Sequence, residues 1–153
     1  MNRGRYDQWD KHFLNRSPMF EPLYRVAHTL NQFDHWPTLD HLNCLLAIQE
    51  PSIRTHTHLS LQLVPQAISI QQFDQQYEPR TYLYGELQTR THNWHDLSNA
   101  LVWMSFPYSK ALLNALHYHV LRIDVGQSRT TRSRLRDAAT LFDESGVLVT
   151  SSH

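Results

Sequence analysis

Residues 93–117 read NWHDLSNALVWMSFPYSKALLNALH, and this stretch decides the predicted fold class. Asn93 is a natural helix N-cap, and Asp96 lies three residues later, as in a capping box. Pro107 ends the first helix and suits the first turn of the next one, where its missing N–H is not needed. The stretch therefore predicts two consecutive helices, at about 94–105 and 107–119, that form an αα-hairpin.

Helical patterns also precede and follow this pair of helices. In the N-terminal third, Ser17-Pro18 and Trp36-Pro37 each mark the start of a helix. A last helix is predicted from apolar residues at helical spacing, and it closes at Gly146. The apolar residues of this last helix are Leu135, Ala138, Ala139 and Phe142.

Two segments carry the signs of strands. From residue 53 to residue 63, apolar or threonine residues alternate with polar ones, which predicts a strand that ends at Pro65. Arg80–Tyr84 is predicted to be a second strand, with Gly85 in the turn after it. Val147–Val149 is a candidate for a short third strand.

The predicted fold is α+β and predominantly α-helical, with a small sheet of two to three strands. The chain has 153 residues, and domains typically contain about 100–150 residues. Residues 1–153 are therefore predicted to form a single domain.

Composition excludes several classes of protein. Lys and Arg together number 14, as do Asp and Glu, so no basic excess favours nucleic acid or an anionic membrane surface. The only cysteine, Cys44, lies among leucines and is predicted to be a buried, inert thiol, which fits a reducing compartment. No secretory signal or apolar run of about 18 residues is visible, so we expect a cytoplasmic protein.

Polar candidates for a site gather around the first helix of the pair. His95 and Asn99 lie on one face of this helix, with Arg90 just before it. A histidine in this place can serve as a general base or bind a metal, or it can bond a neighbouring loop without any catalytic role. Asp96 is interpreted as a capping residue, favoured by the helix dipole.

The second helix of the pair places Lys110, Asn114 and His117 on one face. This face is either solvated, or it binds a phosphate or carboxylate through the charge of Lys110 and the amide of Asn114. Arg136 and Asp137 stand at the start of the last helix and are candidates for the same pocket. They follow a basic run that consists of Arg129, Arg132, Arg134 and Arg136.

Several of the eleven histidines form close pairs: His56/His58, His92/His95 and His117/His119. Two ligands do not make a metal site, which normally needs three or four from the protein. His117 and His119 are two residues apart on a helix, so their side chains diverge by about 200°. No metal ligand and no other cofactor is predicted.

The order of these motifs resembles the uncharacterised bacterial family DUF3025. The segments that carry the resemblance are Tyr77-Glu78, Tyr84-Gly85, Thr89-Arg90, 93–97, 99–101, Trp103, Phe106-Pro107, Lys110-Ala111, 114–117, 136–138 and 140–146. The resemblance covers residues 61–149 and implies that these polar positions belong together, but it implies no activity. Members of the family continue with a further segment, so the chain is expected to be a short or C-terminally truncated member.

Two main functions are compatible with these residues. The first is an enzyme, a hydrolase or transferase, that acts on a small anionic substrate. In it, His95 and Asp137 would be catalytic, and the binding residues would be Arg90, Asn99, Lys110 and Asn114. The second is a non-catalytic domain that binds a protein partner through its Trp and Tyr residues. A metal-dependent ββα nuclease fits less well, because Pro107 separates Asn99 from Asn114. The sequence does not predict an oligomeric state.

Overall fold

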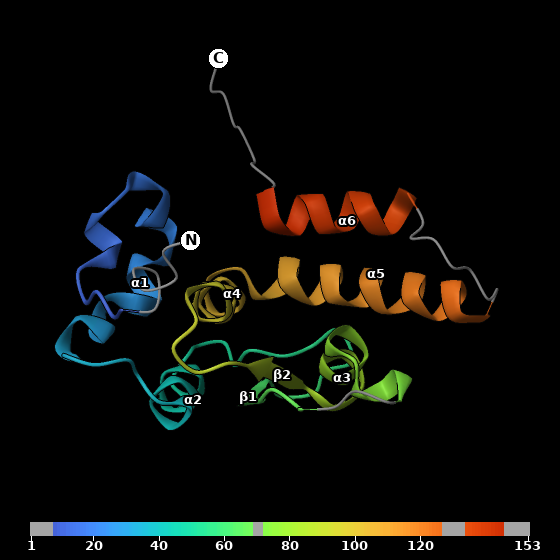
Figure 1. Cartoon of the computed structure of the whole chain (residues 1–153), viewed down its shortest axis with the longest axis horizontal. Coiled ribbons are helices and arrows are strands. Elements are labelled where there is room, and N and C mark those ends of the chain that lie inside the picture. Colours follow the sequence, from blue (N-terminus) through green and yellow to red (C-terminus); the bar gives the residue numbers. More distant parts are fainter. Residues whose placement is uncertain (1–7, 69–71, 127–133, 146–153) are drawn as a thin grey trace, which may run out of the picture.

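The computed structural model describes residues 8–68, 72–126 and 134–145. Its α-helices cluster around a small sheet, and α5 lies between α6 on one side and α3 on the other (Figure 1). The elements are the 3₁₀ helices η2 Phe13–Asn15, η3 Pro18–Leu23, η4 His28–Gln32 and η5 Phe73–Gln75; the helices α1 Tyr24–Ala27, α2 Leu39–Ala47, α3 Tyr77–Tyr84, α4 Trp94–Ser105, α5 Pro107–Gly126 and α6 Arg134–Ser145; and the strands β1 Gln62–Pro65 and β2 Glu86–Thr89. The predominantly helical α+β prediction is confirmed.

Capping residues explain where the N-terminal helices begin. The Ser17 side chain accepts a hydrogen bond from the Met19 N–H at the start of η3. Thr38 forms a capping box with His41, so α2 starts at Leu39. This start is two residues after Pro37, which marks the predicted one. Both predicted helix starts are confirmed to within a turn.

The core is continuous from the N-terminal helices to α5. Trp103, Leu101, Leu87 and Leu30 are among its most buried side chains. Three tryptophans, Trp9, Trp36 and Trp94, pack against one another at the edge of this core, with ring centroids 4.7–5.3 Å apart. These rings attach the N-terminal segment to the first turn of α4.

Strands β1 and β2 pair in parallel, with Leu63 opposite Leu87. Parallel strands need a crossover connection, and η5 and α3 supply it here. On the other side of β1, the Asn43 side chain donates to the Leu63 carbonyl and accepts from the Leu63 N–H, both at 2.9 Å. Helix α2 is thereby fixed to the edge of the sheet.

The first predicted strand ends at Pro65 as expected but begins too early, and the second predicted strand is wrong. Residues 53–61 form a tight turn closed by an isolated antiparallel bridge between Arg54 and Ser60, and the strand covers only Gln62–Pro65. His58 adopts a left-handed φ of 63° in this turn, so the alternating pattern does not describe an extended chain. The segment Arg80–Tyr84 is helical, because it continues α3 as far as the left-handed C-cap residue Gly85.

Helices α4, α5 and α6 follow the predicted order. Phe106 alone separates α4 from α5, and Figure 1 shows α4 nearly end-on while α5 lies across the view. Helix α5 runs to Gly126, beyond the predicted end near residue 119, and therefore includes Asp124 and Val125. The candidate strand 147–149 lies outside the described residues.

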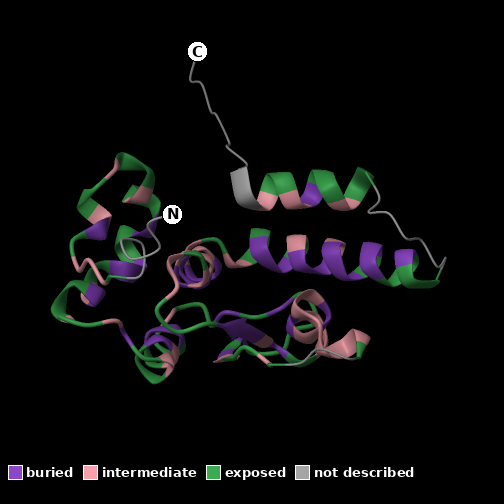
Figure 2. Cartoon of the chain, in the orientation of Figure 1, coloured by how far each residue is buried: buried purple, intermediate pink, exposed green. Residues whose placement is uncertain are grey.

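Helix α6 turns its apolar side away from the rest of the molecule. Leu135, Leu141 and Phe142 are each more than half exposed. The side that faces α5 carries Ala139 and partly buried polar residues, as the colouring of α6 in Figure 2 shows. Helix α6 thus places polar side chains over α5.

The prediction that Cys44 is buried is wrong, because its side chain is exposed. The buried stripe of α2 consists of Leu42, Leu45 and Leu46, and Cys44 lies on the other side of the helix. Among the helices in the described ranges, none is both long and apolar enough to cross a membrane.

Gly85 offers a direct test of the turn between α3 and β2. Its φ is +73°, and a Cβ atom at this position would lie 2.5 Å from the carbonyl oxygen of Ser60. We expect Gly85→Ala to lower the free energy of unfolding by about 1–3 kcal/mol, as measured by urea denaturation.

Gly126→Ala is the matched control for this variant, because a Cβ atom at that position meets nothing within 4 Å. Alanine in place of glycine in a helix is neutral or stabilising by up to about 1 kcal/mol. Equal effects of the two substitutions would contradict the assignment of a steric constraint at Gly85.

Candidate functional site

A cleft of about 860 Å³ lies among α3, β2, α4, α5, α6 and η3. Its polar lining residues are Gln66, Tyr77, Glu78, Gln88, Arg90, His95, Asp96, Ser98, Asn99, Lys110, His117, Arg136, Thr140 and Asp143. Its apolar lining residues are Met19, Phe20, Pro22, Leu23, Trp94, Val102, Phe106 and Leu121. Four of the six residues predicted as a site, namely Arg90, His95, Asn99 and Lys110, therefore border one space.

At one end of the cleft, Asp96 organises the first turn of α4. Its N–H donates to the Asn93 side chain, which confirms Asn93 as the N-cap. Its carboxylate accepts two hydrogen bonds of 2.9 Å from the Arg90 guanidinium and one of 2.8 Å from the Arg90 N–H. Burial alone would raise the pKa of Asp96, but the hydrogen bonds from Arg90 and His95 outweigh it and lower the pKa to about 2.

His95 stands at the rim of the cleft. Its side chain is 73% exposed, and its Nδ1 lies 3.0 Å from Oδ1 of Asp96. The ring is thus open to solvent on most of its surface. The contact with Asp96 orients the ring, but the protein does not enclose it.

The polar face of α5 is buried, so a solvated face is excluded. Lys110, Asn114 and His117 are only 3–7% exposed. The Lys110 ammonium donates to Asp143 of α6 at 2.5 Å, which fastens α6 over α5. In agreement with the predicted divergence of the pair, His119 is exposed whereas His117 is buried.

Asn114 directs its amide onto α3. Its Nδ2 donates to the carbonyl oxygen of Glu78 at 3.0 Å and to Oε2 of the same residue at 2.7 Å. Its Oδ1 is buried and makes no hydrogen bond to any described residue. A buried acceptor without a partner is uncommon in folded proteins.

Glu78 is the site residue that the sequence prediction missed. It lies in the first turn of α3 and keeps partial exposure toward the cleft. Desolvation of its carboxyl group raises its pKa to about 7, even though the Asn114 hydrogen bond and the Lys110 charge oppose this shift. The one sequence signal for Glu78 is the Tyr77-Glu78 pair, which belongs to the family resemblance.

Tyr77 joins the same group from the neighbouring position. Its hydroxyl accepts a hydrogen bond from Nδ2 of Asn99 at 2.5 Å. Burial, together with the charges of Glu78, Asp96 and Asp143, raises the pKa of Tyr77 well above its ordinary range, so the phenol stays protonated. Asn99 therefore connects α4 to the start of α3.

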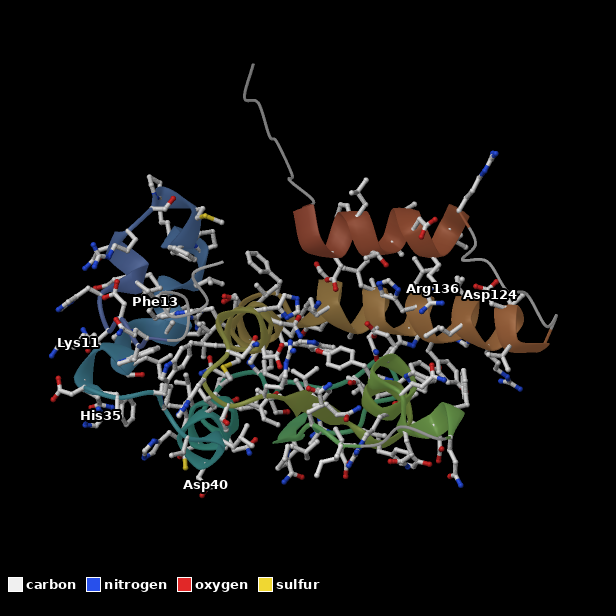
Figure 3. The ribbon with its side chains drawn as sticks, viewed as in Figure 1. Lys11, Phe13, His35, Asp40, Asp124 and Arg136 are labelled. Carbon is white, nitrogen blue, oxygen red and sulfur yellow. The ribbon has the colours of Figure 1, made fainter. Side chains whose placement is uncertain are left out.

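Asp137 is not part of the cleft lining, and its side chain is exposed. On a helix, successive side chains diverge by about 100°. Arg136, the preceding residue, is the one that borders the cleft, and Figure 3 shows it between α6 and α5. The structure thus assigns Arg136 to the pocket in place of Asp137. Arg129 and Arg132 lie outside the described residues.

The structure also locates the histidine pairs. His56 and His58 are exposed in the turn before β1, and His92 is exposed ahead of α4. Within residues 8–68, 72–126 and 134–145, no three side chains of His, Cys, Asp or Glu gather in an arrangement that could hold a metal ion.

Comparison with known proteins identifies the family of this chain. Residues 61–153, more than half of the chain, match the family model described as "Protein of unknown function (DUF3025)". The chain belongs to the DUF3025 family. Neither the curated proteins nor the solved structures contain a match. The DUF3025 match includes every polar lining residue of the cleft, whereas the apolar residues of η3 lie before it.

The buried carboxyl of Glu78 predicts an unusual pH dependence of stability. Its pKa is raised from 4.5 to about 7, so the folded protein keeps a proton that the unfolded chain has lost between these values. Stability from this group is present below about pH 4.5 and is lost as the pH rises toward 7. We expect Glu78→Gln, which mimics the neutral acid, to raise the free energy of unfolding by about 1–3 kcal/mol at pH 8.

Near pH 3 the same substitution should have little effect, because this pH lies well below both pKa values and Glu78 is then largely neutral in both states. Glu50→Gln is the matched control, since Glu50 is exposed. Urea denaturation of the three proteins at both pH values gives the comparison. A Glu78→Gln variant that is less stable than the wild type at pH 8 would contradict the assignment.

Proposed function

We propose that the cleft is the active site of an enzyme, a hydrolase or transferase that acts on a small anionic substrate. In this proposal Glu78 is the residue that donates a proton to the substrate or accepts one from it. The observation that supports it most strongly is the Glu78 carboxyl with a pKa of about 7, held by Asn114 at the edge of a large cleft.

A carboxyl group with this pKa is suited to proton transfer. At neutral pH both its protonated and its ionised forms are populated, so it can donate or accept a proton at little cost. Its burial reduces the stability of the fold at neutral pH, and a perturbed group in a cleft is characteristic of functional sites. The Asn114 amide fixes the orientation of the carboxyl relative to the cleft.

The charges around the cleft support an anionic substrate. Arg90, Lys110 and Arg136 contribute three cations, and Asp96 and Asp143 contribute two anions. Arg90 and Lys110 are already oriented by Asp96 and Asp143, so they can hold an anion without first becoming ordered.

His95 has a different role in this proposal from the one predicted. The sequence predicts it to be the general base, but its ring is largely exposed, whereas the Glu78 side chain is only partly exposed. A low-polarity environment favours the tuning of a proton-transfer group, and solvent opposes it. His95 is accordingly placed as a contact for substrate at the rim of the cleft.

A non-catalytic interaction domain remains the second candidate. Exposed Tyr108 on α5 and exposed Leu141 and Phe142 on α6 favour it, since aromatic and apolar side chains anchor interfaces. Trp9 and Trp36 give it less support, because both rings are partly buried against the core. The ββα nuclease receives no support from the sheet, whose two strands are parallel.

The cytoplasm of a bacterium is the proposed location, in keeping with the single cysteine and the family resemblance.

The proposal predicts a specific loss of activity in Glu78→Gln. Assays with a panel of chromogenic carboxylic and phosphate esters should identify a class of ester that the protein hydrolyses. The pH dependence of this hydrolysis rate should show a group with a pKa near 7. Glu78→Gln should then lower kcat by about 10²- to 10⁴-fold, the usual contribution of general acid–base catalysis. His95→Gln should lower the rate much less, and Glu50→Gln should not change it.

Two results would reject this function. One is the absence of turnover for every ester in the panel, and the other is a Glu78→Gln variant as active as the wild type. A binding partner recovered equally by the wild type and by Glu78→Gln would then favour the interaction domain.

A further inference from the structure

The cleft has an apolar wall in addition to its polar one. Along α4, Trp94, Ser98 and Val102 recur every four residues, and Phe106 follows at the same spacing as the C-cap residue. Residues four apart lie one above the other on a helix, so they form a continuous stripe. At about 1.5 Å per residue, the stripe extends over roughly 18 Å.

The N-terminal segment contributes a second set of apolar residues to this wall. Met19, Phe20, Pro22 and Leu23 of η3 line the same cleft, and η3 packs against α4. Met19 is 73% exposed and Phe106 is 45% exposed. Met19 and Phe106 therefore keep apolar surface open to solvent, and water contact with such surface is unfavourable.

Charged residues from other elements also line the cleft, and His95, Asp96 and Asn99 of α4 lie beside the stripe. Glu78 lies on α3, Lys110 on α5, and Arg136 on α6. A bound molecule can therefore contact charged groups of α3, α5 and α6 and, along α4, the apolar side chains of the stripe. A ligand that is polar throughout would leave the stripe in contact with water.

We infer that the substrate is amphipathic, with an anionic head among Glu78, Lys110 and Arg136 and an extended apolar tail along Trp94, Ser98 and Val102. This inference rests on the proposed function, because it names the substrate class for the same cleft. A volume of about 860 Å³ is at the upper end of ordinary ligand pockets, which measure about 300–1,000 Å³. A medium-length alkyl chain with a carboxylate or phosphate head matches both walls.

Ser98 is the position at which the tail can be tested. It is the one small, polar residue in the stripe, and it borders the cleft between Trp94 and Val102, where a short side chain takes up little of the space. A phenylalanine at this position would fill that space and exclude an alkyl chain. Ser109→Phe is the matched control, because Ser109 is exposed on α5 and does not line the cleft.

The experiment measures the affinity of linear alkanoates from butanoate to decanoate by isothermal titration calorimetry, with decyl phosphate as the second head group and decylamine as the cationic analogue. For the wild type and for Ser109→Phe, the dissociation constant should fall about fourfold for each added methylene, since each buried methylene is worth about 0.8 kcal/mol. Ser98→Phe should abolish this dependence on chain length and weaken decanoate at least about tenfold while butanoate is unaffected. Decylamine should bind more weakly than the two anions.

The same titrations in Glu78→Gln separate this inference from the proposed function. The dependence on chain length should persist in that variant, because the stripe does not contain Glu78. If Glu78→Gln abolishes turnover but affinity does not change with chain length in the wild type, the amphipathic substrate is wrong and the catalytic role stands. If affinity rises with chain length and Ser98→Phe leaves it unchanged, the tail does not lie on α4 and the inference is overturned.

Discussion

The contact between Asn114 and Glu78 joins two helices that are 36 residues apart in sequence, and the rest of the cleft depends on it. The Asn114 amide binds both the backbone carbonyl and the side-chain carboxyl of Glu78. The first bond positions α3 against α5, and the second fixes a carboxyl group at the edge of the cleft. One side chain thus sets the packing of two helices and the chemistry of the space between them.

Helix α6 completes this arrangement through polar contacts. Its Asp143 binds the buried ammonium of Lys110, and its Arg136 borders the cleft, while Leu141 and Phe142 face solvent. In most surface helices the apolar side packs on the core and the polar side is solvated. The reversed orientation of α6 follows from what it covers, since α5 presents Lys110, Asn114 and His117 on that part of the molecule.

Local sequence rules predicted those parts of the fold that depend on local interactions. Asn93 and Pro107 fix the starts of α4 and α5 through capping and ring geometry, and both starts are correct. The period-two pattern of residues 53–61 failed, because a bridge between Arg54 and Ser60 folds this segment back on itself. Strand β2 was not predicted, since its register depends on pairing with β1, more than twenty residues away.

The same distinction applies to the site. The spacing of Lys110, Asn114 and His117 on a helix identified a polar face, but only the docking of α3 and α6 shows that this face is buried. Glu78 could not be recognised from its neighbours, because an acidic residue in the first turn of a helix is an ordinary surface feature. Its altered acidity arises from helices that pack on it from elsewhere in the chain.

The Asn43 side chain affects whether the edge of the sheet can pair with strands of other molecules. A two-stranded sheet normally leaves backbone N–H and C=O groups free along its outer edges, and such edges can recruit strands from other chains. At Leu63 both groups are already bonded to the Asn43 amide. A side chain of α2 therefore occupies the place that a third strand would take, and it closes the central part of this edge to intermolecular pairing and aggregation.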